Sequence, residues 1–307
     1  MLAAYYSSFG GPEVIKLGDQ PAPLLGKDEI LVKVRASALN PVDYRLRQGQ
    51  FQWALRRKLP KLIGADFAGE VVQSNHPDYR KGQAVFGQVS ALKGGAHAQL
   101  LVAKPHQLAP KPDNLIWEEA AALPLVSSTV VQSLRDWVKL QSGETMAIIG
   151  GGGGVGTMAI QYARHLGATV TAVGSTGKQS LMEELGADHV VDYTQERLTG
   201  QYDVVFDAAG QQTWSEGKNF LKKGGRWLTL QPYPKYYALM ALTWFLPKKL
   251  KVMLNRVNAK DMQVIRELAE TAILQPVIDS TFTLEDVQKA YERLESGHCA
   301  GKVVLLH

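Results

Sequence analysis

The stretch from Thr145 to Gly156 reads T-M-A-I-I-G-G-G-G-G-V-G, and it decides the fold class of this chain. Its apolar start is typical of a short buried strand, and the residues after it repeat apolar side chains at helical spacing. Gly151, Gly153 and Gly156 satisfy the pattern G-x-G-x-x-G. In this pattern the first glycine permits a tight turn, the second lets the backbone approach a pyrophosphate, and the third lets helix and strand pack closely. We therefore expect a strand, a glycine turn and a helix N-terminus that binds a dinucleotide.

Five consecutive glycines would also fit a flexible linker, so the surrounding sequence has to decide. Strand-like runs follow at 168–173, 187–193, 202–206 and 226–230, the last one after an expected turn at Gly224-Gly225. Helix-like segments alternate with the first of these runs, which favours an α/β fold with a doubly wound parallel sheet of the Rossmann type. The N–H groups of Gly154 and Val155 complete the expected anion site.

The two ends of the chain have a different pattern. Residues 29–36 alternate apolar and polar side chains, as in a half-buried strand, and turn residues are dense through residue 120. The tail predicts helix 260–272, strand 277–282, helix 284–296 and strand 302–306. The simplest assembly returns this tail to the first domain. We expect a mostly β domain from residues 1–121 and 259–307 and a Rossmann domain from residues 122–258.

Composition limits the classes of protein that need consideration. The chain has 307 residues, a net charge of +5 and one cysteine, Cys299, so we expect no internal disulfide and a reducing, cytoplasmic location. We expect no secretory signal in the first ten residues. The longest apolar stretch, Tyr236 to Leu246, is too short to cross a bilayer. We interpret it as a buried or interface helix and expect no membrane partner.

Basic residues gather in two places. One cluster contains Arg56, Arg57, Lys58 and Lys61, and the other contains Lys248, Lys249 and Lys251. Solvated surface is the favoured interpretation, and the phosphates of a cofactor or an acyl-CoA substrate are the alternative. No nucleic-acid module accompanies them, so we expect no nucleic-acid partner.

Several motifs in the right order resemble the medium-chain dehydrogenase/reductase superfamily, in particular its zinc-independent quinone oxidoreductase branch, the relatives of zeta-crystallin. The motifs are 40–44 (N-P-V-D-Y), 64–69 (G-A-D-F-A-G), 120–124 (A-A-A-L-P), 150–156, 185–189 (L-G-A-D-H), 203–210 and 297–304. The resemblance covers nearly the whole chain. It implies a GroES-like β domain made from both chain ends, a Rossmann domain between them, an active site in the cleft, and commonly a homodimer.

The zinc-binding branch of that superfamily would carry Cys near position 40 and Gly-His-Glu where Gly64-Ala65-Asp66 stands. Neither is present. Because zinc needs about three protein ligands of N, S or O type, we expect no metal site.

The end of the second Rossmann strand bears on the choice of cofactor. NAD-binding domains place an Asp or Glu there to hold the ribose 2′-hydroxyl, whereas this chain continues with Ser175, Thr176 and Lys178. Hydroxyl groups and a positive charge suit a 2′-phosphate, so NADPH is favoured over NADH. By resemblance, Tyr193 flanks the adenosine phosphate. It would otherwise be an ordinary tyrosine at a strand end.

The resemblance also implies catalytic positions. Asn40, Asp43 and Tyr44 would lie in a loop near the nicotinamide, where Asn40 donates to a carbonyl oxygen and Tyr44 relays a proton. Thr129 would contact the carboxamide and Lys302 would approach the cofactor. Each has a structural alternative: Asn40 begins a turn at Asn40-Pro41, Asp43 braces the loop, and Lys302 lies on the surface of the last strand.

Two functions fit this sequence. The first is an NADPH-dependent, zinc-independent oxidoreductase that transfers hydride to a quinone or an α,β-unsaturated carbonyl compound, both electron-poor small molecules. The second is a nucleotide-binding sensor, scaffold or RNA-binding protein with little or no enzymatic activity. It is supported by the basic surface and by Arg45 and Phe51, which stand where many similar enzymes have tyrosines.

Overall fold

The chain forms two compact units. The structure, a computed structural model, describes residues 1–50, 52 and 59–307, so the expectations for Phe51 and for the basic cluster at 56–58 lie outside the described residues. Unit 1 comprises Met1–Leu125 and Val257–His307, and unit 2 comprises Val126–Arg256. The sequence-based boundaries were residues 121/122 and 258/259.

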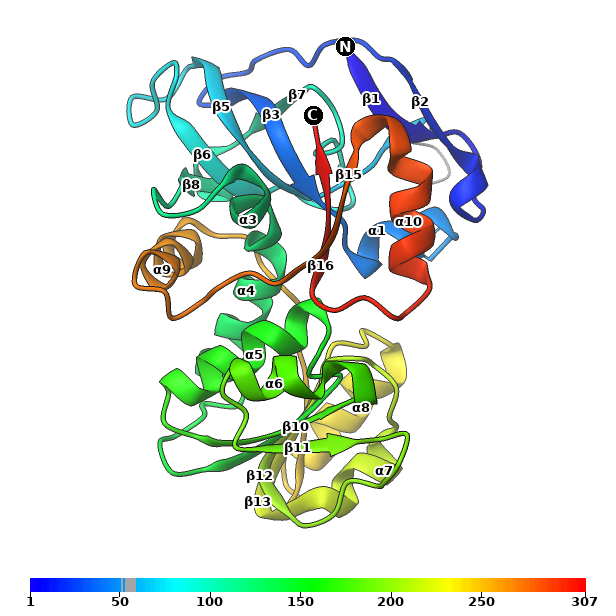
Figure 1. Cartoon of the computed structure of the whole chain (residues 1–307), viewed down its shortest axis with the longest axis vertical. Helices are drawn as coiled ribbons and strands as arrows, with labels where there is room; N and C mark the ends of the chain where they lie inside the picture. The colour runs from blue at the N-terminus through cyan, green and yellow to red at the C-terminus, as the bar shows by residue number, and fades with distance from the viewer. Residues whose placement is uncertain (51, 53–58) are drawn as a thin grey trace. The chain divides into compact units, whose positions relative to one another are not determined.

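Unit 2 is built on a parallel sheet that has six strands among the described residues, in the order β11-β10-β9-β12-β13-β14. The strands are β9 (Thr145–Ile149), β10 (Thr169–Gly174), β11 (His189–Asp192), β12 (Tyr202–Asp207), β13 (Leu221–Thr229) and β14 (Lys249–Val252). The helices are α5 (Gly154–His165), α6 (Gln179–Glu184), α7 (Trp214–Gly217) and α8 (Pro234–Thr243). Figure 1 shows α5 and α6 on one side of the sheet and α7 and α8 on the other. Because the strand order grows outward from β9 in both directions, right-handed crossovers place the helices on opposite faces, which confirms the doubly wound fold.

One strand of this sheet differs from its prediction. The chain was expected to turn at Gly224-Gly225 and to start a strand at Arg226, but β13 begins at Leu221 and runs through both glycines. The pairing of β12 with β13 shifts register between Tyr202 and Val204, as at a β-bulge. Gly224 takes a positive φ of 86°, so the glycines absorb an irregularity within the strand and do not end it.

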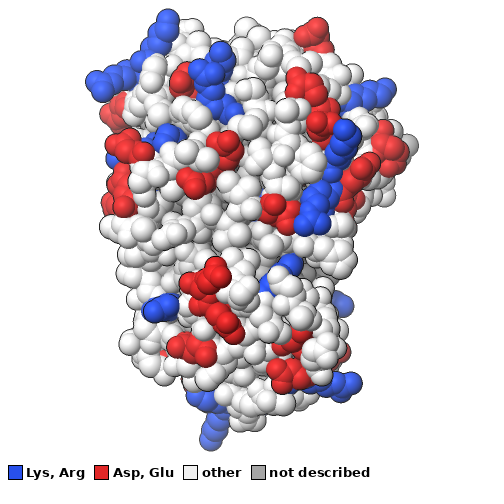
Figure 2. Space-filling model, viewed as in Figure 1, with Lys and Arg blue, Asp and Glu red and all other residues white. Residues whose placement is uncertain are grey.

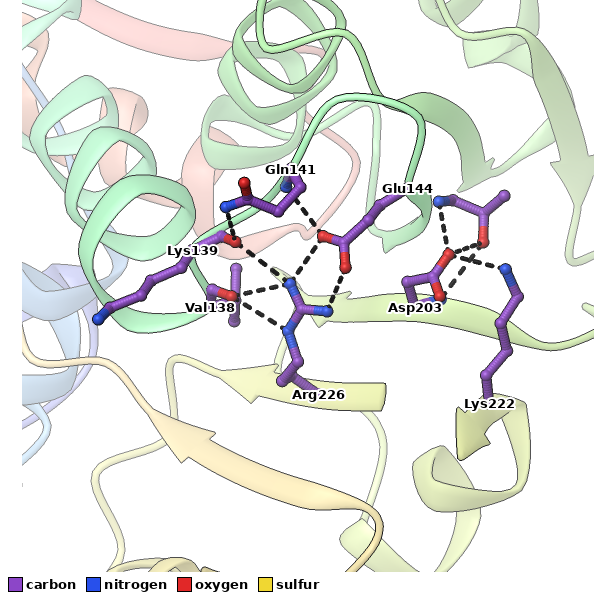
Figure 3. Close-up of polar contacts among 8 residues, drawn as sticks. Val138, Lys139, Gln141, Glu144, Asp203, Lys222 and Arg226 are labelled. Carbon is purple, nitrogen blue, oxygen red and sulfur yellow. Dashed lines mark hydrogen bonds and ion pairs between the residues drawn. The ribbon is translucent and has the colours of Figure 1, made fainter. Parts of the chain in front are cut away.

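Arg226 on β13 fixes the segment that leads into β9. Its guanidinium donates to Val138 O at 3.0 and 2.8 Å and to the two carboxylate oxygens of Glu144 at 2.6 and 2.7 Å. Figure 3 shows this contact beside a second one, in which Asp203 accepts from Lys222 at 2.7 Å. Arg226 holds the pKa of Glu144 below its usual range, so the carboxylate stays charged. These contacts position the start of β9 before the glycine turn.

Unit 1 contains a seven-stranded sheet and a three-stranded sheet among its described residues. Their strands are β1 (Leu2–Tyr6), β2 (Ile15–Asp19), β3 (Ile30–Ala38), β4 (Lys61–Leu62), β5 (Asp66–Ser74), β6 (Ala84–Gln88), β7 (Leu100–Ala103), β8 (Leu108–Pro110), β15 (Ile278–Thr283) and β16 (Lys302–Leu306). The helices are α1 (Pro41–Arg47), α3 (Trp117–Ala122), α9 (Ala259–Glu270) and α10 (Val287–Glu295), and α4 (Pro124–Val131) begins in this unit. β16 from the tail pairs antiparallel with β3, opposite Ala36 to Ala38. The two chain ends thus share one sheet, as in a GroES-like domain.

The alternation in β3 has the expected consequence. Ile30, Val32 and Val34 are buried in one apolar cluster, whereas Lys33 is exposed. A second cluster packs α10 against β1 and β16 through residues such as Tyr6, Tyr291 and Val303. The hairpin of β1 and β2 was not predicted, because neither strand shows a clear period-two pattern.

The segment after β3 is helical, although it was expected to be a loop. α1 starts at Pro41, with Asn40 as the residue before the helix in an extended conformation. Proline suits the first helical position because its missing N–H would have no partner in the helix. The helix fixes the positions of Asn40 and Asp43, whose side chains take part in the site described next.

Candidate active site

The glycine turn joins β9 to α5. Gly150 has a positive φ of 83°, and the N–H groups of Gly150 and Gly151 both donate to Val173 O at the end of β10. The first helical bond runs from Thr157 N to Gly153 O at 2.9 Å. The N–H groups of Gly154, Val155 and Gly156 therefore precede the first helical hydrogen bond and can bind an anion at the helix start.

Two glycines of the motif differ in whether the fold itself requires them. A Cβ atom on Gly156 would lie 2.1 Å from Gly150 O, so the packing of helix against turn excludes any side chain there. A Cβ atom on Gly153 would meet only Gly150 O, at an ordinary 3.5 Å. Gly153 also has extended dihedral angles that any residue adopts. The fold itself therefore does not need glycine at 153, and the open space over it suits the close approach of a pyrophosphate.

The loop after β10 holds the residues expected at the 2′-phosphate. Ser175 precedes the short helix Thr176–Lys178, and its carbonyl accepts from Lys178 N at 2.9 Å. The methylene groups of Lys178 lie against Gly152, since a Cβ on that glycine would meet Lys178 Cδ. The charged residue of this loop therefore lies beside the glycine turn.

A carboxylate lies next to this loop, which the sequence reasoning did not anticipate. Asp192, at the end of β11, accepts from Thr176 Oγ1 at 2.5 Å, from Gln179 Nε2 at 3.1 Å and from Thr194 N at 2.9 Å. These hydrogen bonds, that of Thr176 first, lower the pKa of Asp192. Thr176 was expected to offer its hydroxyl to a phosphate, but the structure directs that hydroxyl to Asp192, so Thr176 orders the loop.

Tyr193 and Thr129 take different environments within unit 2. Tyr193 follows Asp192 with its side chain 59% exposed, and its N–H donates to Gly174 O at 3.1 Å. Its ring is therefore accessible beside the end of β10. Thr129 lies on α4, where its hydroxyl accepts from Asn255 Nδ2 at 3.0 Å. Asn255 was not among the expected site residues.

In unit 1, four polar residues form a buried group that we call the Asn40 cluster: Asn40, Asp43, Asp66 and Lys302. Asn40 donates from Nδ2 to Asp66 at 2.9 Å and accepts from Lys302 Nζ at 2.5 Å. Lys302 Nζ also donates to Leu39 O at 2.8 Å and lies 3.5 Å from Asp66. Asn40 and Asp66 are completely buried and Lys302 is 4% exposed.

Burial dominates the electrostatics of this cluster. It raises the pKa of Asp43 to about 7, with a further contribution from the charge of Asp66. It raises the pKa of Asp66 to about 6, although Lys302 and Asn40 oppose the shift. Burial also lowers the pKa of Lys302. Burial thus raises the pKa of both carboxyl groups above the range of ordinary surface carboxylates.

Of the expected catalytic residues, Asn40 and Asp43 belong to this cluster and Tyr44 lies outside it. Asp43 accepts from Asn40 N at 3.0 Å and so braces the start of α1, which was the structural alternative for it. Asn40 uses its amide on Asp66 and Lys302, which favours a positioning role over donation to a substrate. Tyr44 is partly buried against the apolar cluster of α10 and β1. Lys302 is buried, so the alternative of a surface lysine is wrong.

Asp66 was missed as a site residue, although a signal was present. It occupies the position of Glu in the Gly-His-Glu motif of the zinc-binding branch, and it is joined to Asn40, at the position of Cys. It also accepts the N–H of Leu125 at the start of α4 at 3.0 Å. No group of three or more His, Cys, Asp or Glu able to hold a metal ion occurs within residues 1–50, 52 and 59–307.

Comparisons with known proteins match both parts of the chain. Residues 26–113 match the family model described as alcohol dehydrogenase GroES-like domain, and residues 185–305 match the one described as zinc-binding dehydrogenase. A solved structure of the quinone oxidoreductase from Coxiella burnetii superposes with a TM-score of 0.93 at 29% identity, covering 100% of this chain and 99% of that one.

Two plant enzymes are similar over almost the whole chain. The 2-methylene-furan-3-one reductase of Solanum lycopersicum is 35% identical, over 99% of this chain and 79% of the plant enzyme. The chloroplastic NADPH-dependent alkenal/one oxidoreductase of Arabidopsis thaliana is also 35% identical over the same shares of both chains.

Proposed function

Because this chain belongs to the medium-chain dehydrogenase/reductase superfamily, in its zinc-independent quinone oxidoreductase branch, we propose that it is an NADPH-dependent reductase of quinones or α,β-unsaturated carbonyl compounds. The observation that carries this proposal is the open space over Gly153 at the start of α5. The fold has room for a side chain at this position, but a side chain there would block the approach of a dinucleotide's pyrophosphate. NADPH in the name of the Arabidopsis relative supports the choice of cofactor.

The residues of unit 2 fit this cofactor. The backbone of Gly151, Gly153, Gly154, Val155 and Gly156 would hold the pyrophosphate. Lys178 and Ser175 would bind the 2′-phosphate, and the exposed ring of Tyr193 would flank the adenosine. When bound, NADPH supplies a hydride from C4 of its nicotinamide ring.

The acceptor is expected to be electron-poor before it binds. Asn and Ala stand at positions 40 and 65, where the zinc-binding branch has Cys and His, so this chain supplies neither of these two ligands to polarise a simple ketone. A quinone or a conjugated carbonyl needs no such help. The hydrogen bonds within the Asn40 cluster hold the start of α1 in place. Tyr44, on the same helix, remains the proposed proton relay.

Assembly and location are further parts of the proposal. We expect a homodimer that joins the two copies through the open edge of β14, the end strand of the six-stranded sheet formed by the described residues. We expect the enzyme to act in the cytoplasm. Sedimentation velocity and fractionation of cells test these two expectations.

The activity is tested by steady-state oxidation of NADPH with 1,4-naphthoquinone, a series of 2-alkenals and a 2-alkenoyl-CoA. Turnover with at least one class, with NADH much weaker, is the expected result. The Gly153→Val variant serves as the control and should be folded and inactive. Tight NADPH binding with no turnover of any acceptor would refute the reductase and favour a nucleotide-binding sensor.

A further inference from the structure

A carboxylate at the end of β11 lies beside the loop that we assign to the 2′-phosphate of the cofactor. β10 and β11 are parallel neighbours, and Gly174 at the end of β10 stands opposite Asp192 at the end of β11. In a domain that selects NADH, the acid that holds the ribose 2′-hydroxyl stands at the end of the second strand, which is β10 here. This chain has its acid one strand away, and neighbouring strands lie only about 5 Å apart.

Asp192 is buried, and the chain itself supplies all of its hydrogen-bond donors. The residue is 4% exposed. Its Oδ2 accepts from Thr176 Oγ1 at 2.5 Å and from Gln179 Nε2 at 3.1 Å. Its Oδ1 accepts from the N–H of Thr194 at 2.9 Å and from the hydroxyl of Thr194 at 2.7 Å. An ionised carboxylate offers about four lone-pair sites, so these four bonds fill them. We call the four residues the Asp192 network.

The Asp192 network connects two loops at this edge of the sheet. Thr176 and Gln179 belong to the loop after β10, whereas Thr194 belongs to the turn after β11. The C=O of Asp192 begins that turn, because it accepts two backbone N–H groups at 3.0 and 2.9 Å. The conformation of the loop after β10 therefore depends on a side chain that lies 16 residues further along the chain than Thr176.

The residues proposed for the 2′-phosphate lie next to the two anchored residues. Ser175 precedes Thr176, and Lys178 precedes Gln179. The C=O of Ser175 accepts from Lys178 N at 2.9 Å, which closes a turn between them. Because one carboxylate holds Thr176 and Gln179 together, it sets the direction in which the neighbouring side chains leave the turn. Asp192 thus controls the phosphate site through other residues.

The charge around this loop does not by itself favour a phosphorylated cofactor. Between Gly174 and Gly200 the sequence carries more acidic than basic residues, namely Glu183, Glu184, Asp188, Asp192 and Glu196 against Lys178 and Arg197. Figure 2 shows acidic and basic side chains intermixed on the visible face of the molecule. Selection of a 2′-phosphate therefore depends on contacts at short range, and these depend on the geometry of the loop.

We propose that Asp192 is a positioning residue that makes the cofactor site selective for NADPH. It holds the loop of residues 175–179 so that Ser175 and Lys178 meet the 2′-phosphate. Its own acceptor sites are filled, so it is closed to the ribose 2′-hydroxyl of NADH. The inference rests on the proposed use of NADPH and adds the residue that determines the choice between the two cofactors.

Two other roles of this carboxylate lead to different expectations. A charge that faces the cofactor would repel the 2′-phosphate, so its removal would strengthen NADPH binding. A residue that only stabilises the turn after β11 would affect both cofactors equally when it is removed. The positioning role requires weaker binding of NADPH while NADH binding is preserved.

Titrations of variants with NADPH and with NADH distinguish these roles. Asp192→Ala releases Thr176 and Gln179, and we expect NADPH to bind about tenfold more weakly while NADH changes by less than about twofold. Thr176→Val keeps the shape of the side chain and opens one acceptor site on Asp192. It should weaken NADPH about fivefold and strengthen NADH about threefold. Thr176→Ser restores the hydroxyl and should restore both affinities to within about twofold.

Asp188→Ala is the matched control. Asp188 directly precedes β11, and its carboxylate likewise accepts from β10, at 2.7 Å from Val170 N. It lies at the amino end of the strand, whereas cofactors bind at the carboxyl ends of parallel strands. The ratio of NADPH to NADH affinity should therefore stay within about twofold of that of the unaltered protein. Unfolding midpoints verify that every variant is folded.

Four outcomes would overturn the proposal. Tighter NADPH binding by Asp192→Ala would show repulsion, and equal weakening of both cofactors would show a general structural role. An unchanged affinity ratio in Thr176→Val would show that the network does not govern the choice. An unaltered protein that binds NADPH no better than NADH would refute the inference as well. Because these titrations involve no acceptor, failure of the reductase activity is detected separately, by the absence of turnover.

Discussion

The glycine turn of unit 2 and the Asn40 cluster of unit 1 handle polar groups in opposite ways. At the turn the residues are glycines and backbone N–H groups precede the first helical bond of α5, so a bound anion can complete the site. In the cluster, Lys302, Asn40 and Asp66 satisfy one another and are buried. A binding site is thus marked by hydrogen-bonding groups that the fold itself does not pair. A buried set of polar side chains that bond one another chiefly sets the stability of the fold and its dependence on pH.

Substitutions at Gly156 and Gly153 should change different properties of the protein, and these changes are the largest that we expect. Gly156→Ala should lower the free energy of unfolding by about 4 kcal/mol, because its Cβ would overlap the backbone of Gly150. Gly153→Val should change stability by less than about 1 kcal/mol and yet weaken NADPH binding at least about 100-fold. Chemical denaturation and NADPH titration measure the two effects. Equal losses of stability in both variants would contradict the distinction.

Breaking the Asn40 cluster should have the next largest effect. Lys302→Met leaves the carboxyl of Asp66 buried beside Asn40 without its cation, and we expect about 3 kcal/mol of lost stability at pH 7. Adding Asp66→Asn to that variant should restore about half of the loss. If the double variant were no more stable than the single one, the charge of Asp66 would not be the cause.

The pH dependence of the cluster is tested with Asp43→Asn. The pKa of Asp43 rises from its ordinary 3.8 to about 7 on folding, so the folded state binds the proton more tightly and the contribution of Asp43 to stability falls as pH rises from about 4 to 7. Asn has no proton to lose. The variant should therefore gain at least about 2 kcal/mol relative to the unaltered protein between those pH values.

Histidines also change the free energy of unfolding with pH, but they do so equally in the Asp43→Asn variant and in the unaltered protein. Burial lowers the pKa of His97 and His307, which adds a slope of opposite sign below pH 6.5 in both proteins. Denaturant titrations at several pH values supply the difference between variant and unaltered protein. A difference that stays constant with pH would show that Asp43 does not titrate on folding.

The smallest effect concerns the choice of cofactor. Lys178→Met keeps the methylene stem against Gly152 and removes the charge. We expect NADPH to bind about fivefold to tenfold more weakly, whereas NADH affinity should change by less than about twofold. Parallel titrations with the two cofactors decide this. Equal weakening of both would place Lys178 away from the 2′-phosphate.

The sequence predicted the sheet of unit 2 better than it predicted the polar contacts. Four of its strands and the helix after the glycines carry strong local patterns, which tertiary packing does not override. α1 was missed although Asn40, Pro41 and Asp43 have the spacing of a helix start. β14 was missed because its lysines were taken only as a charge cluster, although Lys249 to Val252 alternate with a period of two.

The contacts of Asp66 and Asp192 lay beyond any local pattern. Asp66 meets Lys302, which is 236 residues away in sequence, only after β16 pairs with β3. Asp192 meets Thr176 because β10 and β11 are neighbours in register. Such pairs depend on which strands lie side by side, so spacing along the chain does not specify them.

Hydride transfer from NADPH to an activated acceptor is the activity that we propose for this chain. The most direct measurement uses NADPH carrying deuterium at the transferred C4 position, a 2-alkenal as acceptor, and mass spectrometry of the product. We expect the deuterium at the β-carbon of the saturated aldehyde, and we expect the Gly153→Val variant to form no product. NADPH oxidation in which the label appears in water, and the β-carbon stays unlabelled, would refute direct hydride transfer to the acceptor.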